Sequence, residues 1–325
     1  GLILMKEFDA SYAVFDIEYT EGSPLGVNSA YLNREIPELF AQEFAGLSQN
    51  VQDFFNALRK GTIALRDAGD YLQDLAGLTE TSKNLLLEKV KDISRDNDEY
   101  LGRAARLFGK AYFTVNMLPQ VEGAMPEALK TYVLDSIALK KVQGYEGFPF
   151  VARDLRPAIL PILKRARGAG FPNIGVDSDG VLRRIHLVMK YEDRFFPQLG
   201  LAALLDWMGS PQVEVSEKRI VLRDAEVPGK GRQNVVIPLT EDRRMLINWP
   251  KKGFLESFRH LSWYALVLHQ RLEESLIYNL KLMEEAGYLK YFQADYGLLD
   301  PYRHAAGILK EMLEGADLQS VEEYR

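Results

Sequence analysis

The chain has 325 residues, a net charge of −6 at pH 7 and 47% hydrophobic residues, so it is long enough to bury one large core or two ordinary ones. The mild acidity argues against a nucleic-acid surface, which needs concentrated Lys and Arg. The absence of cysteine excludes disulfides, thiolate catalysis and cysteine-based metal sites, and it fits either an oxidising or a reducing compartment.

The first predicted element is a buried strand over residues 11–17, where aromatic and β-branched residues cluster. Asp16 and Glu18 stand at its end, and the polar stretch 20–24 predicts a loop. Carboxylates at the carboxyl end of a strand lie where open α/β sheets place ligands. Two interpretations stay open: these side chains are solvated loop residues, or they contact a ligand.

A heptad pattern of apolar residues follows and predicts a long helix over 36–75, bent or interrupted at Gly61 and Gly69. A second helix over 81–93 is expected to return alongside it. Heptads do not reveal whether the partner helix belongs to the same chain. An inert insertion and a dimerisation or docking rod are therefore both compatible with the pattern.

Residues 96–108 predict a helix that ends at Gly109, and the apolar run 110–118 predicts a second core strand. A helix, a glycine and a strand in this order form the αβ half of a βαβ unit. A further helix is predicted over 126–141.

Two apolar runs, 171–176 and 181–189, flank the turn Asp177-Ser178-Asp179-Gly180. Asp and Gly suit such a turn, so the pattern predicts a β-hairpin whose second strand carries Arg183 and Arg184. The later elements predicted are a buried helix over 199–208, strands over 217–224, 235–239 and 245–248, of which the last two pair, and helices over 254–286 and 301–314.

The order of three motifs, Gly-Phe-x-Asn at 170–173, Asp-x-Asp-Gly-Val-x-Arg-Arg at 177–184 and Phe-Pro at 196–197, resembles the CHASE domains of the second type. These are extracytoplasmic sensor modules of transmembrane receptors with an adenylate cyclase, histidine kinase or similar output. The resemblance implies a mixed-sheet α/β sensor domain over residues 1–325. The helical insertion at about 36–95 and the C-terminal helices at about 253–325 depart from the family pattern.

An enzymatic alternative rests on Asp177 and Asp179, whose spacing resembles the nucleophile motif of haloacid-dehalogenase-type, magnesium-dependent phosphatases. That motif belongs on a first strand, whereas here it lies halfway along the chain, and a turn accounts for both aspartates. His260 and His269 lie about 13 Å apart along one helix, too far to share a metal. We therefore expect no catalytic residue, no cofactor and no metal.

The resemblance and the strand-end carboxylates together predict a receptor for an unknown small-molecule or protein signal. The expected ligand-binding residues are Asp16, Glu18, Asp177, Asp179, Arg183 and Arg184. No run reaches the roughly 18 apolar residues of a membrane helix. Both ends read as cuts in a longer polypeptide, so the membrane contact is expected through flanking helices, with this segment outside the cytoplasm. A homodimer through helices 36–75, or a purely structural interaction module, is the alternative that the heptads permit.

Overall fold

The computed structural model describes residues 1–28, 31–291 and 297–314. The chain forms two compact units, one made of Gly1–Gly22 together with Leu101–Arg325 and the other of Ser23–Tyr100. We call them the sheet unit and the hairpin unit and describe each by itself. Both contain helices and short strands, as expected for a mixed α/β chain. The assignment of all 325 residues to a single domain stays a prediction.

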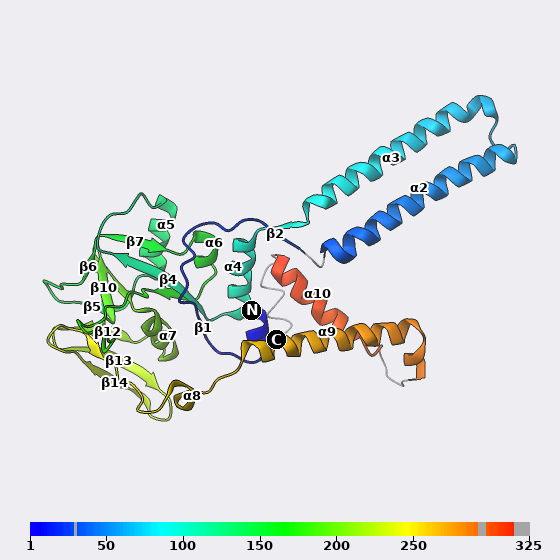
Figure 1. Cartoon of the computed structure of the whole chain (residues 1–325). Helices are drawn as coiled ribbons and strands as arrows, with labels where there is room; N and C mark the ends of the chain where they lie inside the picture. Colours follow the sequence, from blue (N-terminus) through cyan, green and yellow to red (C-terminus); the bar gives the residue numbers. More distant parts are fainter. Residues whose placement is uncertain (29–30, 292–296, 315–325) are drawn as a thin grey trace. The chain divides into compact units, whose positions relative to one another are not determined.

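The sheet unit is organised around β4 (Ala111–Leu118), in which residues 111–117 are all buried. It pairs in parallel with β1 (Ala13–Val14) and with β8 (Gly168–Gly170), and antiparallel with β7 (Asp154–Pro157) (Figure 1). A strand covered on both faces reads as a continuous apolar run, which explains why the sequence predicted β4 correctly.

The helix α4 (Asn97–Phe108) leads into β4, as predicted. Asp96 caps it, because its Oδ1 accepts the backbone N–H groups of Asp98 at 3.0 Å and Glu99 at 2.9 Å. Gly109, with φ +92°, ends the helix in a conformation that side-chain-bearing residues rarely adopt. The predicted helix–glycine–strand unit is therefore confirmed.

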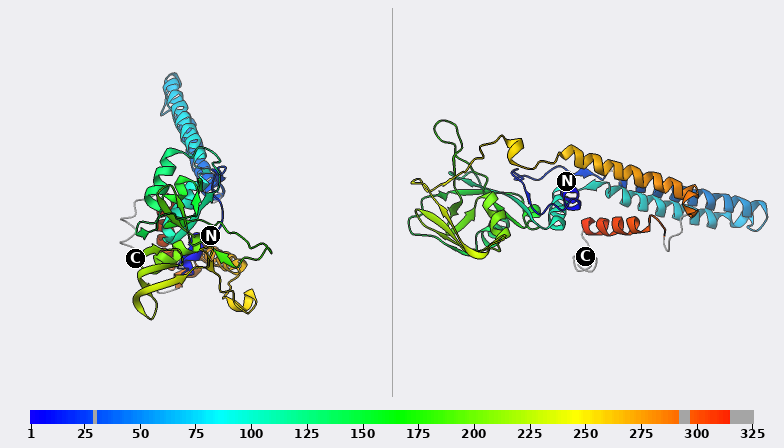
Figure 2. Two further views of the ribbon diagram at one scale, coloured as in Figure 1. Left: turned by 90° about the vertical axis from the view of Figure 1, so that its left-hand side faces the viewer. Right: turned by 90° about the horizontal axis from the view of Figure 1, so that it is seen from below.

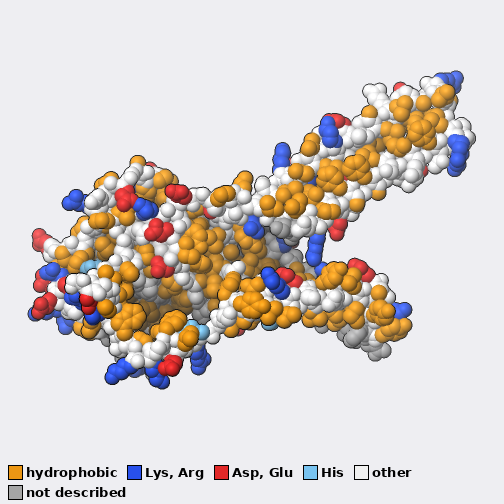
Figure 3. Space-filling model, in the orientation of Figure 1, with side chains coloured by type: hydrophobic (Ala, Val, Ile, Leu, Met, Phe, Trp, Pro, Cys, Tyr) orange, Lys and Arg blue, Asp and Glu red, His pale blue; other side chains and the backbone are white. Residues whose placement is uncertain are grey.

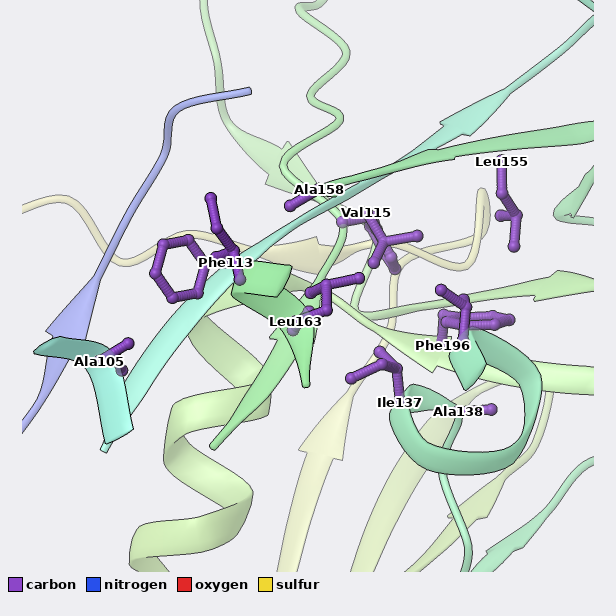
Figure 4. Close-up of a cluster of buried hydrophobic side chains, with 14 of the residues drawn as sticks. Ala105, Phe113, Val115, Ile137, Ala138, Leu155, Ala158, Leu163 and Phe196 are labelled. Atoms are coloured by element: carbon purple, nitrogen blue, oxygen red, sulfur yellow. The ribbon is translucent and has the colours of Figure 1, made fainter. Parts of the chain in front are cut away.

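The core of the sheet unit lies between β4, β7, β8 and the helical segments that cover them (Figure 4). Phe113, Val115, Leu163 and Phe196 are each fully buried in it. The covering helices are α1 (Leu2–Glu7), α5 (Glu127–Tyr132), which continues as a π-helical turn over Val133–Ile137, and α6 (Leu160–Leu163). The predicted helix over 126–141 is thus confirmed in its first part and ends before Ala138.

A second core lies under the strands that follow α7 (Leu199–Trp207). Their sheet has the order β14-β13-β12-β5, with bounds Gly231–Pro238, Arg219–Val227, Gln212–Val215 and Val142–Gln143. A smaller sheet has the order β11-β10-β6, with bounds Arg194–Pro197, Val188–Tyr191 and Val151–Ala152. The predicted pairing of 235–239 with 245–248 is wrong, because β14 turns back at Gly229 and Gly231, both with positive φ, and pairs with β13.

The predicted hairpin across residues 177–180 is also wrong, although the turn itself forms. Beyond the turn, β9 (Arg184–Ile185) pairs with β15 (Met245–Leu246) rather than with residues 171–176. Phe171 is engaged elsewhere, since its N–H donates to the Pro197 carbonyl at 3.0 Å and its carbonyl accepts from Leu199 at 2.9 Å. The long-range pairing of β9 with β15 thus takes the place of the local hairpin that the two apolar runs indicated.

The C-terminal part of the sheet unit is helical, as predicted, but its long helix is divided. The single helix predicted over 254–286 is replaced by α8 (Phe254–Ser257), an extended segment, and α9 (Trp263–Glu285). Residues 300–314 form α10 (Asp300–Glu314), and residues 315–325 of the predicted helical segment lie outside the described residues. α9 packs on α1, where Phe8 and His269 meet edge to face at 5.1 Å.

The hairpin unit consists of two antiparallel helices, α2 (Ile36–Arg59) and α3 (Ala68–Lys91), above a short pairing of β2 (Gly26–Val27) with β3 (Ser94–Arg95). The two helices lie side by side in Figure 1 and in both views of Figure 2. Ser82 donates a 2.6 Å hydrogen bond from α3 to Glu43 of α2. The hairpin insertion and the interruption at Gly61 are confirmed. The return at 77–80 is wrong, because the chain reverses between α2 and α3 and residues 77–80 lie inside α3.

Gly61 ends α2 earlier than the heptads indicated. It has φ +71°, its N–H donates to Leu58 at 3.1 Å, and the N–H of Thr62 donates to Ala57 at 2.9 Å. These two bonds form a Schellman motif, which satisfies the last carbonyls of a helix and turns the chain away. The heptad spacing continues through this turn into α3, so the spacing itself does not show that the chain reverses here.

Candidate functional site

The loop after β1 holds the first two predicted ligand residues, Asp16 and Glu18, and both side chains are exposed. The backbone between them is fixed, because the Ile17 carbonyl accepts the Thr114 hydroxyl at 3.0 Å and the Tyr19 carbonyl accepts the N–H of Ile159 at 2.8 Å. The loop therefore runs along β4 in a defined path and presents its carboxylates to solvent.

Glu18 lies beside a cluster of charged residues that the sequence did not indicate. Its carboxylate is 3.9 Å from the Arg156 guanidinium, which also pairs with Glu122. Asp154 is 8% exposed, and its two oxygens accept the N–H groups of Leu155 at 2.8 Å and Glu122 at 3.0 Å. Asp154 thus holds the loop after β4 so that Glu122 faces Arg156.

A hollow of about 240 Å³ opens at this cluster and is lined by Thr20, Leu118, Asp154 and Arg156 among others. Its place beyond the ends of β1 and β4 is where α/β sheets commonly bind ligands. We call this the edge site. No local pattern links Arg156 to Glu18, which lies more than a hundred residues earlier in the sequence.

The turn at 177–180 holds the other four predicted residues. It is closed by bonds from Gly180 N–H to the Asp177 carbonyl at 2.8 Å and from Asp177 N–H to Val181 at 3.0 Å. Asp179 accepts both guanidinium nitrogens of Arg183, at 2.9 and 2.8 Å. Asp177 accepts Arg184 at 2.7 Å and Arg183 at 3.3 Å. All four side chains are therefore joined in one network.

The network extends to the turn at 240–244, which the pairing of β9 with β15 brings alongside. Arg184 donates to Asp242 at 2.8 Å, and Arg244 pairs with Asp242 and lies 3.6 Å from Asp177. The network thus balances three carboxylates against three guanidinium groups. A ligand that recruited one of these side chains would have to replace an existing ion pair.

Charge pairing lowers the pKa of both aspartates in the turn. The hydrogen bonds from Arg183 and then from the Val181 N–H lower the pKa of Asp179 to about 2, and that from Arg184 lowers the pKa of Asp177. Both groups are ionised at neutral pH, so the turn is held by charge.

The Asp179 pairing is expected to stabilise the folded chain only above a low pH. Because the folded pKa is about 2 and the ordinary value is 3.8, the stabilisation is present above pH 4 and is lost as pH falls toward 2. Chemical denaturation of the wild type and of Asp179→Asn between pH 7 and pH 2 measures this. The two stabilities should converge in that window; a constant difference would contradict the assignment.

The structure does not join the two groups of predicted ligand residues. Within the described ranges, no hydrogen bond or ion pair connects Asp16 or Glu18 to the 177–184 turn. The described part of the chain also contains no group of three or more His, Asp or Glu residues that could hold a metal ion. Asp177, the nucleophile of the phosphatase alternative, is held by Arg183 and Arg184 instead of being open to a substrate.

The fold and these sites define an α/β domain whose strands end in charged loops beside ligand-sized hollows. Comparison with protein families identifies it: the chain belongs to the CHASE2 domain family, whose model matches residues 5–283. CHASE2 is a non-catalytic, extracellular sensory domain of membrane receptors. No curated protein and no solved structure matches the chain. No helix in the described residues is long and apolar enough to cross a membrane.

The three motifs that carried the resemblance have structural roles. Phe171 and Phe196 are fully buried in the core of the sheet unit. The Asn173 amide accepts the Met117 N–H at 2.8 Å and donates to its carbonyl at 3.1 Å, so it pairs with β4 as a neighbouring strand would. Two of the motifs, Gly-Phe-x-Asn and Phe-Pro, therefore supply residues that pack in the core of the sheet unit or bond to β4.

Proposed function

We propose that this chain is the extracytoplasmic signal-sensing domain of a membrane-bound receptor with an adenylate cyclase or histidine kinase output. The observation that carries the proposal is the CHASE2 match over residues 5–283. Membrane helices outside residues 1–325 would connect the domain to that output. The domain itself binds the signal and performs no chemical turnover.

The edge site supports a ligand role for Asp16 and Glu18. Both carboxylates are exposed on a fixed loop, and the neighbouring hollow contains the guanidinium of Arg156 and the buried carboxylate of Asp154. Such a mixture of charges suits a polar ligand that offers both donors and acceptors. The residues Asp177, Asp179, Arg183 and Arg184 are proposed as a second contact surface, on which a protein partner would compete for the existing ion pairs.

Signal transmission requires a ligand that binds two arrangements of the domain with different affinity. We propose the edge site for this role because its residues come from separate segments. Glu18 follows β1, Glu122 follows β4 and Arg156 lies in β7. A ligand that contacts all three would favour the arrangement that holds these segments together.

A thermal-shift screen of polar metabolites tests the edge site. Ligands that use it should raise the unfolding temperature of the wild type and lose that effect in Asp16→Ala and Glu18→Ala. Glu21→Ala, an exposed carboxylate in the same loop, is the matched control and should keep it. Arg183→Ala tests the second surface in the same screen. If every ligand acts equally on all four variants, the binding surface lies elsewhere.

A second candidate function, dimerisation through the hairpin unit, is favoured by exposed apolar side chains along α2. Phe40, Leu47 and Phe54 of the heptad pattern are half-buried or buried. Phe44, Val51 and Phe55 are 57%, 43% and 62% exposed, and Figure 3 shows hydrophobic side chains along the hairpin. Part of the heptad pattern thus packs within the chain. Phe44 and Val51 of the pattern, together with Phe55 beside it, form an exposed apolar stripe that suits a second copy.

Replacing Phe44, Val51 and Phe55 together with serine is expected to convert a dimer into a monomer, because the change removes the apolar surface that would be buried between copies. Sedimentation velocity of the wild type and the triple variant measures this. The triple variant Gln42→Ser, Gln52→Ser and Asn56→Ser alters exposed polar positions of the same helix and should stay dimeric. A monomeric wild type, or a dimeric serine variant of the apolar stripe, would rule out this function.

A further inference from the structure

A cavity of about 360 Å³ lies within the sheet unit, away from the edge site. Its lining residues come from the start of β4 and β8, the segment after the π-helical turn, α7 and the start of β12. This volume lies within the range of small-molecule sites. We call it the junction cavity, because β4 and β8 belong to one sheet and β12 to another.

The interior of the junction cavity is apolar and lies where separate hydrophobic clusters meet. Ile137 and Ala169 belong to the core around β4, whereas Leu205 and Val213 belong to the core under β12 and β13. All four are less than 9% exposed. The two cores therefore leave a space between them that an apolar group would fill, gaining the free energy of removing its surface from water.

The charged lining has an excess of cations. Arg167, Lys140 and Lys141 line the cavity, and Asp206 is the carboxylate among its lining residues. Asp206 is already engaged: it accepts two bonds from Arg167, at 2.8 and 2.6 Å, and lies 3.7 Å from the Lys110 ammonium. Its side chain is only 10% exposed. The charge of Asp206 is thus balanced by residues on one side of the cavity.

The two lysines on the other side have no such partner. Lys141 lies 3.5 Å from the Ser210 carbonyl, and in the described part of the chain neither Lys140 nor Lys141 forms an ion pair with a carboxylate. Both side chains belong to exposed residues at the opening of an apolar cavity. An anion there would find two ammonium groups at short range, next to surface that excludes water.

We infer that the junction cavity binds an amphipathic monoanion, with its apolar body between the two cores and its carboxylate, or a similar anionic group, at Lys140 and Lys141. Such a ligand would contact the sheet that contains β4 and β8 and the sheet that contains β12, so its affinity would depend on how these two sheets pack against each other. The role of the cavity as a second signal input rests on the proposed sensory function; the binding itself does not.

Isothermal titration calorimetry of the whole chain tests the inference with decanoate as the aliphatic probe and 4-phenylbutyrate as the aromatic one. Both share the required chemistry, and their relative affinities distinguish the two kinds of apolar body. Acetate lacks the apolar body and decanol lacks the charge, so each should bind at least tenfold more weakly than decanoate, a difference of about 1.4 kcal/mol or more.

Three variants locate the binding. The double variant Lys140→Gln and Lys141→Gln should weaken decanoate about tenfold while leaving thermal stability unchanged, because both residues are exposed. Lys251→Gln with Lys252→Gln makes the same charge change at an exposed pair outside the cavity and should bind as the wild type does. Ala202→Met, which places a flexible side chain into the cavity, should abolish binding.

Two outcomes would overturn the inference. One is the absence of saturable one-to-one binding by either probe. The other is equal affinity in the two lysine double variants, which would place the probes on other apolar surface. Neither outcome bears on whether the domain lies outside the cytoplasm, so failure of the cavity and failure of the sensory function can be told apart.

Discussion

Replacing Phe113 with alanine is expected to lower the free energy of unfolding of the sheet unit by about 4 kcal/mol. Phe113 is fully buried in the middle of β4. Its ring stacks on Phe15 at 4.9 Å and meets Tyr19 edge to face at 5.7 Å. Truncation therefore removes a large apolar group, leaves a cavity and takes away the packing that fixes the loop carrying Asp16 and Glu18.

Urea denaturation followed by the fluorescence of the chain's Trp residues, in parallel with Phe254→Ala, measures this effect. Phe254 is 69% exposed, so the same chemical change there should alter stability by no more than about 0.5 kcal/mol. Equal effects at the two positions would mean that β4 is not the centre of the core. The loss of ligand response in Phe113→Ala, at temperatures where the variant is folded, would further link the core to the edge site.

The second large effect is expected from Gly170→Ala, which should destabilise the sheet unit by about 3 kcal/mol. A Cβ at this position would lie 2.7 Å from Leu199 Cα, 2.8 Å from Leu199 N and 2.8 Å from the Pro197 carbonyl. All three are backbone atoms and cannot rotate away as a side chain would. The end of β8 and the start of α7 would have to separate, which breaks the two hydrogen bonds made by Phe171.

Gly123→Ala is the matched control for this substitution, because an added Cβ there meets nothing within 4 Å. Its stability should stay within about 0.5 kcal/mol of the wild type. Thermal unfolding of the two variants and the wild type decides the matter. If Gly170→Ala and the wild type have the same unfolding temperature, the backbones of β8 and α7 do not lie in the close contact that leaves no room for a Cβ at Gly170.

The elements that the sequence predicted best are those whose signals are local. β4 is a continuous apolar run, α4 has an Asp cap and a terminal glycine, and α7 follows Pro197 as an Ala- and Leu-rich segment. Each signal acts within a few residues, and the tertiary packing favours the same helix or strand that the local signal predicts. The family resemblance was also correct, since the CHASE2 family model matches residues 5–283.

The elements that the sequence missed depend on partners far along the chain. The apolar runs around residue 177 pair with Leu199 and with β15, which lie tens of residues away, and a period-2 pattern carries no information about the partner. In the hairpin unit, the interruption at Gly61 was predicted, but the reversal of the chain there, in place of the expected return at 77–80, was not. Helix termination is a backbone property that apolar spacing does not report.

The candidate sites divide in the same way. Asp16 and Glu18 were predicted as ligand residues because carboxylates after a strand are a local signal. The ion pair between Glu18 and Arg156, and the pairing of Arg167 with Asp206 at the junction cavity, were not predicted. No sequence pattern near Arg156 or Arg167 predicts the carboxylate with which it pairs, so these contacts are seen only in the folded structure.

The central claim, that this domain faces the outside of the membrane, is tested most directly by labelling a single cysteine. The chain contains no cysteine, and Ser178 is exposed in the 177–180 turn, so Ser178→Cys introduces one reporter into the domain of the full-length protein. Intact cells are treated with a membrane-impermeant maleimide, beside permeabilised cells and the unsubstituted protein. We predict equal labelling with and without permeabilisation; labelling only after permeabilisation would contradict the account.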